Sequence, residues 1–268
     1  MTVINSFLII FADTMQKNSR VIKIVFSIYA ALILLILILV LFPIALILNV
    51  FPKKTRGNLL YRITRFGVDI AMLMWGIYQR TIYDAPHDRK KPMIFVFNHI
   101  SYLDALTILK AIRFQNMRGL GKSEIGDIPV AGLIYRSAVI MVKRTSAEDR
   151  ARSIADLKEA LKHNISIALA PEGTFNETGK PLLPFFDGAF KIAIETQTPI
   201  KPLLFLDTYD RLNYSSILSL TPGQSRVVYL EEIPVTGYTM EDVPVLKQKV
   251  YDAMEKALIR YKASWIKE

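Results

Sequence analysis

The chain has 268 residues, of which 51% are hydrophobic, and its 34 lysines and arginines against 24 acidic residues give a formal net charge of +10. It contains no cysteine, which excludes a disulfide framework, a thiolate nucleophile and a cysteine-based metal site. The positive charge fits anionic lipid head groups or an acidic partner. Nucleic acid would be attracted by the same charge, but the sequence has no dense basic tract or nucleic-acid motif, so we do not expect it as a partner.

The first predicted element is a long apolar helix. Residues Ile24 to Phe51 include no charged side chain. A helix of this length reaches about 40 Å, enough to cross a hydrocarbon core of roughly 30 Å with tilt. We therefore expect a membrane anchor. Pro43 leaves open a membrane-embedded hairpin or re-entrant segment in place of one straight crossing.

Basic residues flank this helix unevenly. Lys17, Arg20 and Lys23 precede it, and a larger group follows it: Lys53, Lys54, Arg56, Arg62 and Arg65. This bias favours a catalytic domain on the cytoplasmic side of the cell membrane. A monotopic anchor with both flanks in the cytoplasm satisfies the same charges.

A second helix, Gly57 to Tyr78, mixes apolar and basic residues. The mixture is typical of an interfacial helix, with apolar residues toward acyl chains and basic ones toward head groups. An ordinary amphipathic helix packed on the catalytic domain would show it equally. We predict an anchoring region over residues 1–80 and an α/β domain over residues 81–268.

A strand followed by a helix carries the first candidate catalytic residues. Met93 to Phe97 is a short apolar run typical of a buried strand, and it ends at Asn98-His99. Tyr102 to Ile112 predicts a helix, with Asp104 in or near its first turn. An imidazole whose second ring nitrogen is held by a carboxylate can take a proton from a hydroxyl. Only three histidines are present in the chain (the others are His87 and His163), so the choice of base is narrow.

Two further strands also end in polar residues. Ala138 to Val142 leads into Lys143-Arg144, and Arg144, like the earlier Lys122, would either bind a phosphate or lie as a solvated charge. Ile165 to Ala170 leads into Pro171-Glu172-Gly173-Thr174. There Gly173 allows close approach of backbone to a ligand and Thr174 offers a hydroxyl, although a simple turn would use both residues equally.

The remaining elements predict an α/β fold. Strands alternating with helices indicate a mixed, largely parallel sheet flanked by helices, preceded here by the apolar N-terminal segment. No set of histidines and carboxylates has the spacing of a metal site. The other expected elements are a helix from Ser146 to His163, a helix over Gly188–Thr196, strands over Pro199–Leu206 and Arg226–Ile233, and a helix over Met240–Lys262.

Four segments taken together resemble the PlsC-like 1-acyl-sn-glycerol-3-phosphate acyltransferases, glycerolipid acyltransferases with a His-x4-Asp motif. Their order and spacing fit that family from about Pro92 to Leu206. The matching segments are Asn98-His-Ile-Ser-Tyr-Leu-Asp104, Lys122-Ser-Glu-Ile with Pro129, Gly132 and Arg144, Pro171-Glu-Gly-Thr174, and Pro199-Ile-Lys-Pro202.

The resemblance implies acyl transfer from a thioester (acyl-CoA or acyl-acyl carrier protein) to the free hydroxyl of lysophosphatidic acid, giving phosphatidic acid, with no other cofactor and no metal. His99 and Asp104 are the expected catalytic pair. Substrate binding is expected at Asn98, Lys122, Arg144, Glu172, Gly173 and Thr174, with the backbone near Gly173 a candidate oxyanion donor.

Two departures from the family pattern bear on the acceptor. The family commonly has an arginine where this chain has Phe175, and often a lysine just before the glycine of the segment that ends here in Asp187-Gly188. Both changes remove a cation that would face an anionic head group. Two alternatives therefore stay open: the same chemistry on another lysolipid, such as a lysophospholipid or an acylated amino acid, or a membrane-anchored lipid-binding protein without catalysis.

Overall fold

A computed structural model of the chain describes residues 20–128, 131–142 and 147–267. Within these residues the centre of the fold is one seven-stranded sheet in the order β1-β7-β6-β2-β5-β3-β4. The strands are β1 (Ile77–Tyr83), β2 (Ile94–Phe97), β3 (Met117–Lys122), β4 (Val139–Val142), β5 (Ser166–Leu169), β6 (Ile200–Phe205) and β7 (Gly223–Tyr229).

Five neighbouring strands, from β6 through β2, β5 and β3 to β4, are parallel. β7 runs antiparallel to β6, and β1 pairs in parallel with β7 at the edge. The mixed, largely parallel sheet predicted from the sequence is confirmed. Parallel strands end at one edge of a sheet, so the polar residues that follow β2, β5 and β6 are brought to a common edge.

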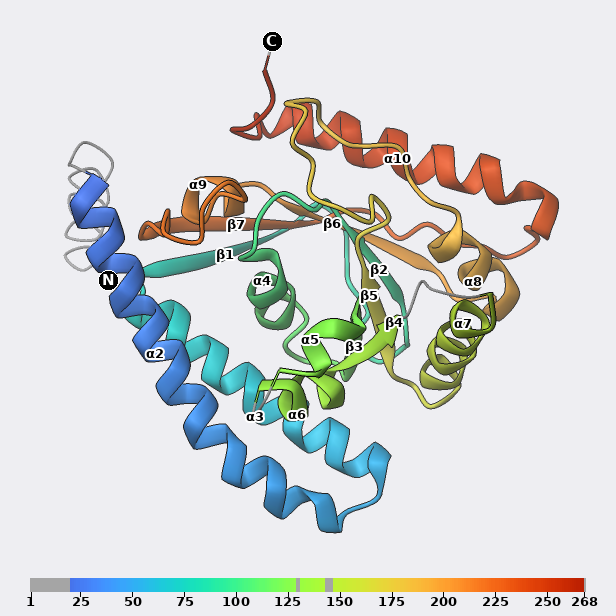
Figure 1. Cartoon of the computed structure of the whole chain (residues 1–268). Helices are drawn as coiled ribbons and strands as arrows, with labels where there is room; N and C mark the ends of the chain where they lie inside the picture. Colours follow the sequence, from blue (N-terminus) through green and yellow to red (C-terminus); the bar gives the residue numbers. More distant parts are fainter. Residues whose placement is uncertain (1–19, 129–130, 143–146, 268) are drawn as a thin grey trace.

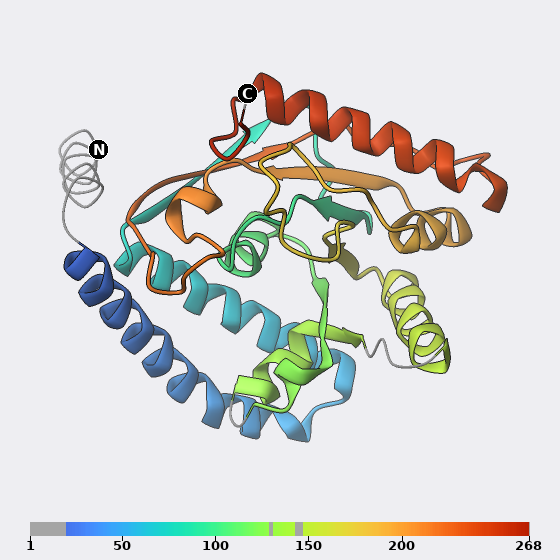
Figure 2. The same cartoon turned by 45° about the horizontal axis from the view of Figure 1, so that its top comes forward.

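Helices cover both faces of the sheet (Figures 1 and 2). The helices of the described residues are α2 (Arg20–Ile47), η1 (Leu48–Val50), α3 (Lys53–Met74), α4 (Asp104–Ala111), α5 (Ser123–Gly126), α6 (Ala131–Ala138), α7 (Ala147–Lys162), α8 (Gly188–Thr196), α9 (Thr208–Arg211), η2 (Met240–Asp242) and α10 (Val243–Arg260).

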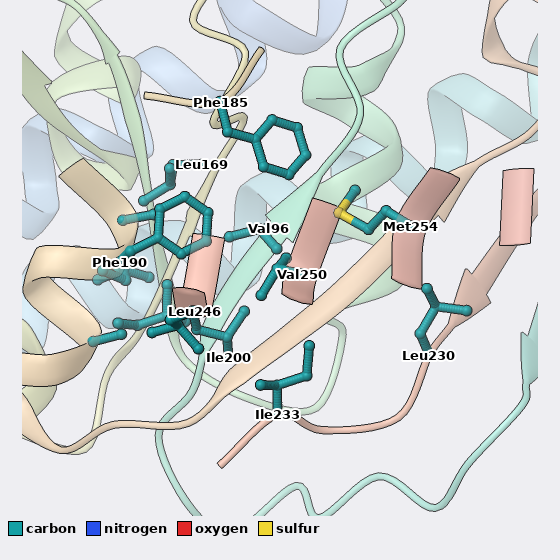
Figure 3. Packing of buried hydrophobic residues seen from close by; sticks show 14 of the residues in the cluster. Val96, Leu169, Phe185, Phe190, Ile200, Leu230, Ile233, Leu246, Val250 and Met254 are labelled. Atoms are coloured by element: carbon teal, nitrogen blue, oxygen red, sulfur yellow. The ribbon is translucent and has the colours of Figure 1, made fainter. Parts of the chain in front are cut away.

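Alternate residues of β2 supply the core on the two faces. Ile94 and Val96 point to the side covered by α7, α8 and α10, where Figure 3 shows Val96 among side chains that include Phe190 and Val250. Phe95 points to the opposite side, toward α4. A strand buried on both faces is apolar throughout, which is why the Ile-Phe-Val-Phe run predicts it so directly.

The N-terminal helix continues through Pro43 without a break. After η1 the chain turns back, and α3 runs alongside α2 as the second arm of a helical hairpin (Figure 1), where Tyr29 Oη donates to Met74 O over 3.3 Å. By length and composition one helix among the described residues, Val21–Val50, suffices to cross a membrane: an 18-residue window within it has a mean hydropathy of 3.4, and only 22% of that window is buried.

Several predicted boundaries were wrong. The second helix ends at Met74, not Tyr78, because Gly76 at φ 63° turns the chain into β1, a strand that we did not predict. The C-terminal helix was predicted to start at Met240, but the chain first forms η2 there and α10 begins at Val243. The division at residue 80 stays a prediction, and it falls inside β1.

Candidate active site

His99 and Asp104 meet in the turn between β2 and α4. His99 Nδ1 lies 2.9 Å from Asp104 Oδ2, and because a carboxylate only accepts, Nδ1 carries the hydrogen. The same oxygen also accepts from the backbone N–H groups of Ile100, at 2.8 Å, and Ser101, at 2.9 Å. Asp104 is the first residue of α4, where the helix dipole favours a negative charge.

The two side chains differ in access to solvent. The Asp104 carboxylate is 0% exposed, whereas the His99 side chain is 30% exposed. With Nδ1 held by the carboxylate, Nε2 is the ring atom left to take a proton. The arrangement is that of a general base, with an accessible imidazole whose tautomer and direction are fixed from behind.

Asn98 joins the ends of two strands. Its side chain is 1% exposed, its Nδ2 donates to Phe205 O over 3.1 Å, and its Oδ1 accepts from Phe205 N over 2.8 Å. The side-chain amide thus bonds to both backbone groups of Phe205 and fixes the end of β2 to the end of β6. Its predicted contact with substrate stays a prediction, since every bond shown here is to the protein's own backbone.

Glu172 connects the two motifs. Its carboxylate is buried, and its Oε1 accepts from the backbone N–H of His99 while its Oε2 accepts from that of Leu183, both over 2.8 Å. Burial raises the pKa of Glu172 from 4.5 to about 7, with the nearby Asp104 charge adding to the rise, although the two N–H donors oppose it. Glu172 therefore fixes the backbone of His99, the candidate base.

Gly173 and Thr174 turn the chain away from β5. Gly173 has φ 70°, a conformation that favours glycine, and its N–H donates to Ala170 O over 3.1 Å. The backbone near Gly173 was the candidate donor to the oxyanion of the reaction, and the N–H of Gly173 itself is used in this bond. Thr174 is exposed, and two residues later Asn176 N donates to His99 O over 2.8 Å. The loop after β5 is thus bonded to His99 at both its N–H and its C=O.

Phe175 packs directly on the candidate base, a contact that the sequence did not reveal. Its ring centroid lies 4.3 Å from that of His99, 4.9 Å from that of Tyr102 and 6.4 Å from that of Tyr214. Phe97 meets the imidazole edge-on at 6.4 Å. An aromatic wall therefore borders His99 on the side of the loop after β5.

Four other residues named in the sequence analysis are not seen in contact with His99. Lys122 is the last residue of β3, at the same edge of the sheet, and the structure does not describe its side chain. Arg144 and Pro129 lie outside the described residues. Asp187 is paired with Lys247 of α10 at 2.7 Å and with Lys191 at 3.8 Å, and the bond to Lys247 is the main cause that lowers its pKa.

Among the described residues no group of three or more histidines, cysteines or carboxylates is arranged to hold a metal ion. The chemistry available at this site is that of an imidazole base backed by a carboxylate. The expectation that no metal takes part stays a prediction.

Comparison with known proteins gives the family. The Acyltransferase family model matches residues 78–206. A 1-acyl-sn-glycerol-3-phosphate acyltransferase of Haemophilus influenzae is 30% identical over 177 residues, which cover 65% of this chain and 72% of that protein. The human 1-acyl-sn-glycerol-3-phosphate acyltransferase beta is 31% identical over 171 residues, 63% of this chain and 60% of its own length.

The fold is also that of a solved structure. The crystal structure of PlsC, the 1-acyl-sn-glycerophosphate acyltransferase from Thermotoga maritima, aligns with a TM-score of 0.73 at 21% identity, covering 93% of this chain and 100% of that one. This chain spans about 60% of the length of the human relative. The chain belongs to the acyltransferase family that includes the 1-acyl-sn-glycerol-3-phosphate acyltransferases.

Proposed function

We propose that this chain is a membrane-bound acyltransferase that moves a fatty acyl group from an acyl thioester to the free hydroxyl of 1-acyl-sn-glycerol-3-phosphate, giving phosphatidic acid. The observation that carries the proposal is the His99–Asp104 contact of 2.9 Å, with the imidazole partly exposed and the carboxylate fully buried. The relatives of this chain that are named as 1-acyl-sn-glycerol-3-phosphate acyltransferases support the choice of acceptor.

In the proposed reaction His99 Nε2 takes the proton of the acceptor hydroxyl while that oxygen attacks the thioester carbonyl carbon. Asp104 stays ionised and stabilises the imidazolium. When the tetrahedral intermediate collapses, the carbon–sulfur bond breaks and the imidazolium returns its proton to the departing thiolate. The products are an ester and a free thiol, and the base is regenerated without a covalent acyl-enzyme.

The substrates are proposed from charge and apolarity. Lys122 and Arg144 would hold the acceptor phosphate, with Asn98, Glu172, Gly173 and Thr174 shaping its surroundings. Acyl-CoA or acyl-acyl carrier protein would be the donor. The apolar helix α2, whose outer side chains are largely exposed, would anchor the protein in the cell membrane with the catalytic domain on the cytoplasmic side.

One observation favours a second candidate, the same chemistry on another lysolipid. Phe175 stands where the family commonly has an arginine, and its ring packs on His99 instead of offering a cation. Asp187 faces Lys247, so the charge at that position is neutralised within the protein. A head group less anionic than a phosphate monoester would match a site that lacks a free cation at positions 175 and 187.

The test is acyl transfer by the purified, detergent-solubilised protein, with an acyl thioester and a panel of lysolipids, read by mass spectrometry. His99→Ala should lower turnover by about 10²- to 10⁴-fold, the usual contribution of a general base. His163→Ala, at an exposed histidine paired with Glu159 on α7, is the matched control and should keep full activity.

Phosphatidic acid as the dominant product would support the leading proposal. A different acylated lipid would replace the acceptor and keep the mechanism. Near-normal activity of His99→Ala would overturn the assignment of the base. Lipid binding by the wild-type protein without any turnover would favour a non-catalytic role.

A further inference from the structure

One segment joins the candidate catalytic turn to the apolar helix. The segment Leu212–Leu220 lies between α9 and β7. At its start Leu212 O accepts from Ser101 Oγ, and Asn213 forms an isolated antiparallel bridge with Ser101. Tyr214 then extends the aromatic wall next to Phe175. One side of the candidate site is therefore built in part from this segment.

The other end of the segment is fixed to α2. Leu220 N donates to Ser27 Oγ over 3.3 Å, and the Leu220 side chain is buried in one cluster with Ala30 and Ile33. Figures 1 and 2 both show the segment, in orange, beside the N-terminal half of α2. Any position that α2 takes in a membrane thus also sets the depth of this segment.

The tip of the segment presents two adjacent apolar side chains to the outside. Ile217 is 69% exposed and Leu218 is 42% exposed. Local side chains hold the backbone of the tip: Asn213 Oδ1 accepts from Ser215 N over 2.8 Å, and Ser216 Oγ accepts from Leu218 N over 3.1 Å. These bonds reduce the cost of moving the tip out of water, since fewer polar groups lose a partner.

The tip and the neighbouring half of α2 both expose apolar side chains, and the charged residues of that half are Arg20 and Lys23. Residues 212–223 contain no charged side chain. The neighbouring half of α2 contributes four apolar residues that are each more than half exposed: Val21, Val25, Ile28 and Leu32. Because the segment that carries the exposed tip is bonded to a helix long and apolar enough to cross a bilayer, the partner that fits both is lipid.

We propose that the 212–220 segment is a second membrane contact, whose tip inserts Ile217 and Leu218 into the bilayer beside α2 and forms the lip over which a lysolipid moves from the membrane to His99. This inference rests on the membrane placement of α2 given in the proposed function. It adds a residue-level entry site that is independent of the nature of the acceptor head group.

The absence of cysteine from the chain makes the test direct, because a single introduced cysteine can carry an environment-sensitive fluorophore. Three labelled variants in phospholipid vesicles are compared. They are Ile217→Cys at the tip, Leu32→Cys on α2, and Val245→Cys on α10, a 59% exposed apolar position on the opposite side of the sheet.

We expect lipids that carry a quencher in their acyl chains to quench the labels at positions 217 and 32, but not the label at position 245. Quenching at position 32 without quenching at position 217 would overturn the proposal that the tip inserts into the bilayer, and would still support α2 as a membrane anchor. Absence of quenching at both would overturn the membrane placement of α2 as well.

A kinetic comparison tests the entry role. Ile217→Glu should lower the rate on a vesicle-embedded lysolipid by about tenfold, the order expected for burying one large apolar side chain, and should leave the rate on a short-chain, monomeric acceptor within about twofold. Val245→Glu should change neither rate. An equal loss on both acceptors would show that the tip acts on the catalytic turn itself and not on lipid entry.

Discussion

Replacing Glu172 with alanine removes both acceptors that hold the turn around His99 in place. The backbone N–H groups of His99 and Leu183 each donate to this carboxylate over 2.8 Å, and the Glu172 side chain is 2% exposed. A buried donor left without an acceptor costs about 1–3 kcal/mol. Two such donors predict a loss of about 2–6 kcal/mol in the free energy of unfolding of Glu172→Ala.

This loss should be visible as heat sensitivity. For a domain of this size, each kcal/mol lowers the melting temperature by roughly 2–4 °C, so we expect a decrease of at least about 4 °C. Glu177→Ala is the matched control, the same substitution at an exposed glutamate of the same loop, and it should change stability by less than about 0.5 kcal/mol.

Activity measured well below the melting temperature separates stability from positioning. A His99 backbone released from Glu172 allows the imidazole to leave the productive geometry, so kcat should decrease at temperatures at which the Glu172→Ala protein is still folded. If Glu172→Ala melts with the wild-type protein and keeps its kcat, the assignment of this carboxylate as the support of the base is refuted.

Three further predictions concern charge and packing. Burial raises the pKa of Glu172 from 4.5 to about 7, so the folded protein binds this proton more tightly than the unfolded chain. As the pH rises from 4.5 to about 7, the unfolding free energy of the wild-type protein should therefore decrease by up to about 3 kcal/mol relative to that of Glu172→Gln. The measurement is the unfolding free energy of both proteins against pH. Asp104→Asn weakens the acceptor that fixes Nδ1, and kcat should decrease by about 10²- to 10⁴-fold in the acyl-transfer assay; an unchanged kcat would remove Asp104 from the mechanism. Gly132→Ala would bring a Cβ to 2.0 Å from Gly126 O, so it should cost about 1–3 kcal/mol by calorimetry, whereas Gly119→Ala, whose nearest contact is 3.8 Å, should not.

The strands that position the candidate base were the most predictable part of the chain. Predicted runs at Met93–Phe97 and Ile165–Ala170 correspond to β2 and β5 within one residue at each end. Both strands are buried on both faces, so an uninterrupted apolar run is enough to identify them. The sequence did not predict that these two strands are neighbours, and it is their parallel pairing in the structure that brings the His99 and Glu172 segments together.

Strands stabilised mainly by their neighbours were not predictable in this way. β3 (Met117–Lys122) includes Arg118 and two glycines and has no apolar run, and it exists because it pairs with β5 on one side and β4 on the other. β1 lies at the edge of the sheet with a mixed pattern of exposure, so its residues were assigned in part to the preceding helix. In both, tertiary pairing outweighs local preference.

The separate roles of the residues in the Pro-Glu-Gly-Thr segment could not be predicted from the sequence for a related reason. A motif indicates which residues gather at a site, but the partner of each side chain depends on contacts between distant parts of the chain. Both Glu172 oxygens accept from the protein's own backbone and the residue is only 2% exposed, so this carboxylate supports the backbone of His99 and Leu183 and is largely closed to a ligand. A substitution at Glu172 that changes the KM for the acceptor is therefore expected to act through the position of His99, and the kcat of the same variant should change with it.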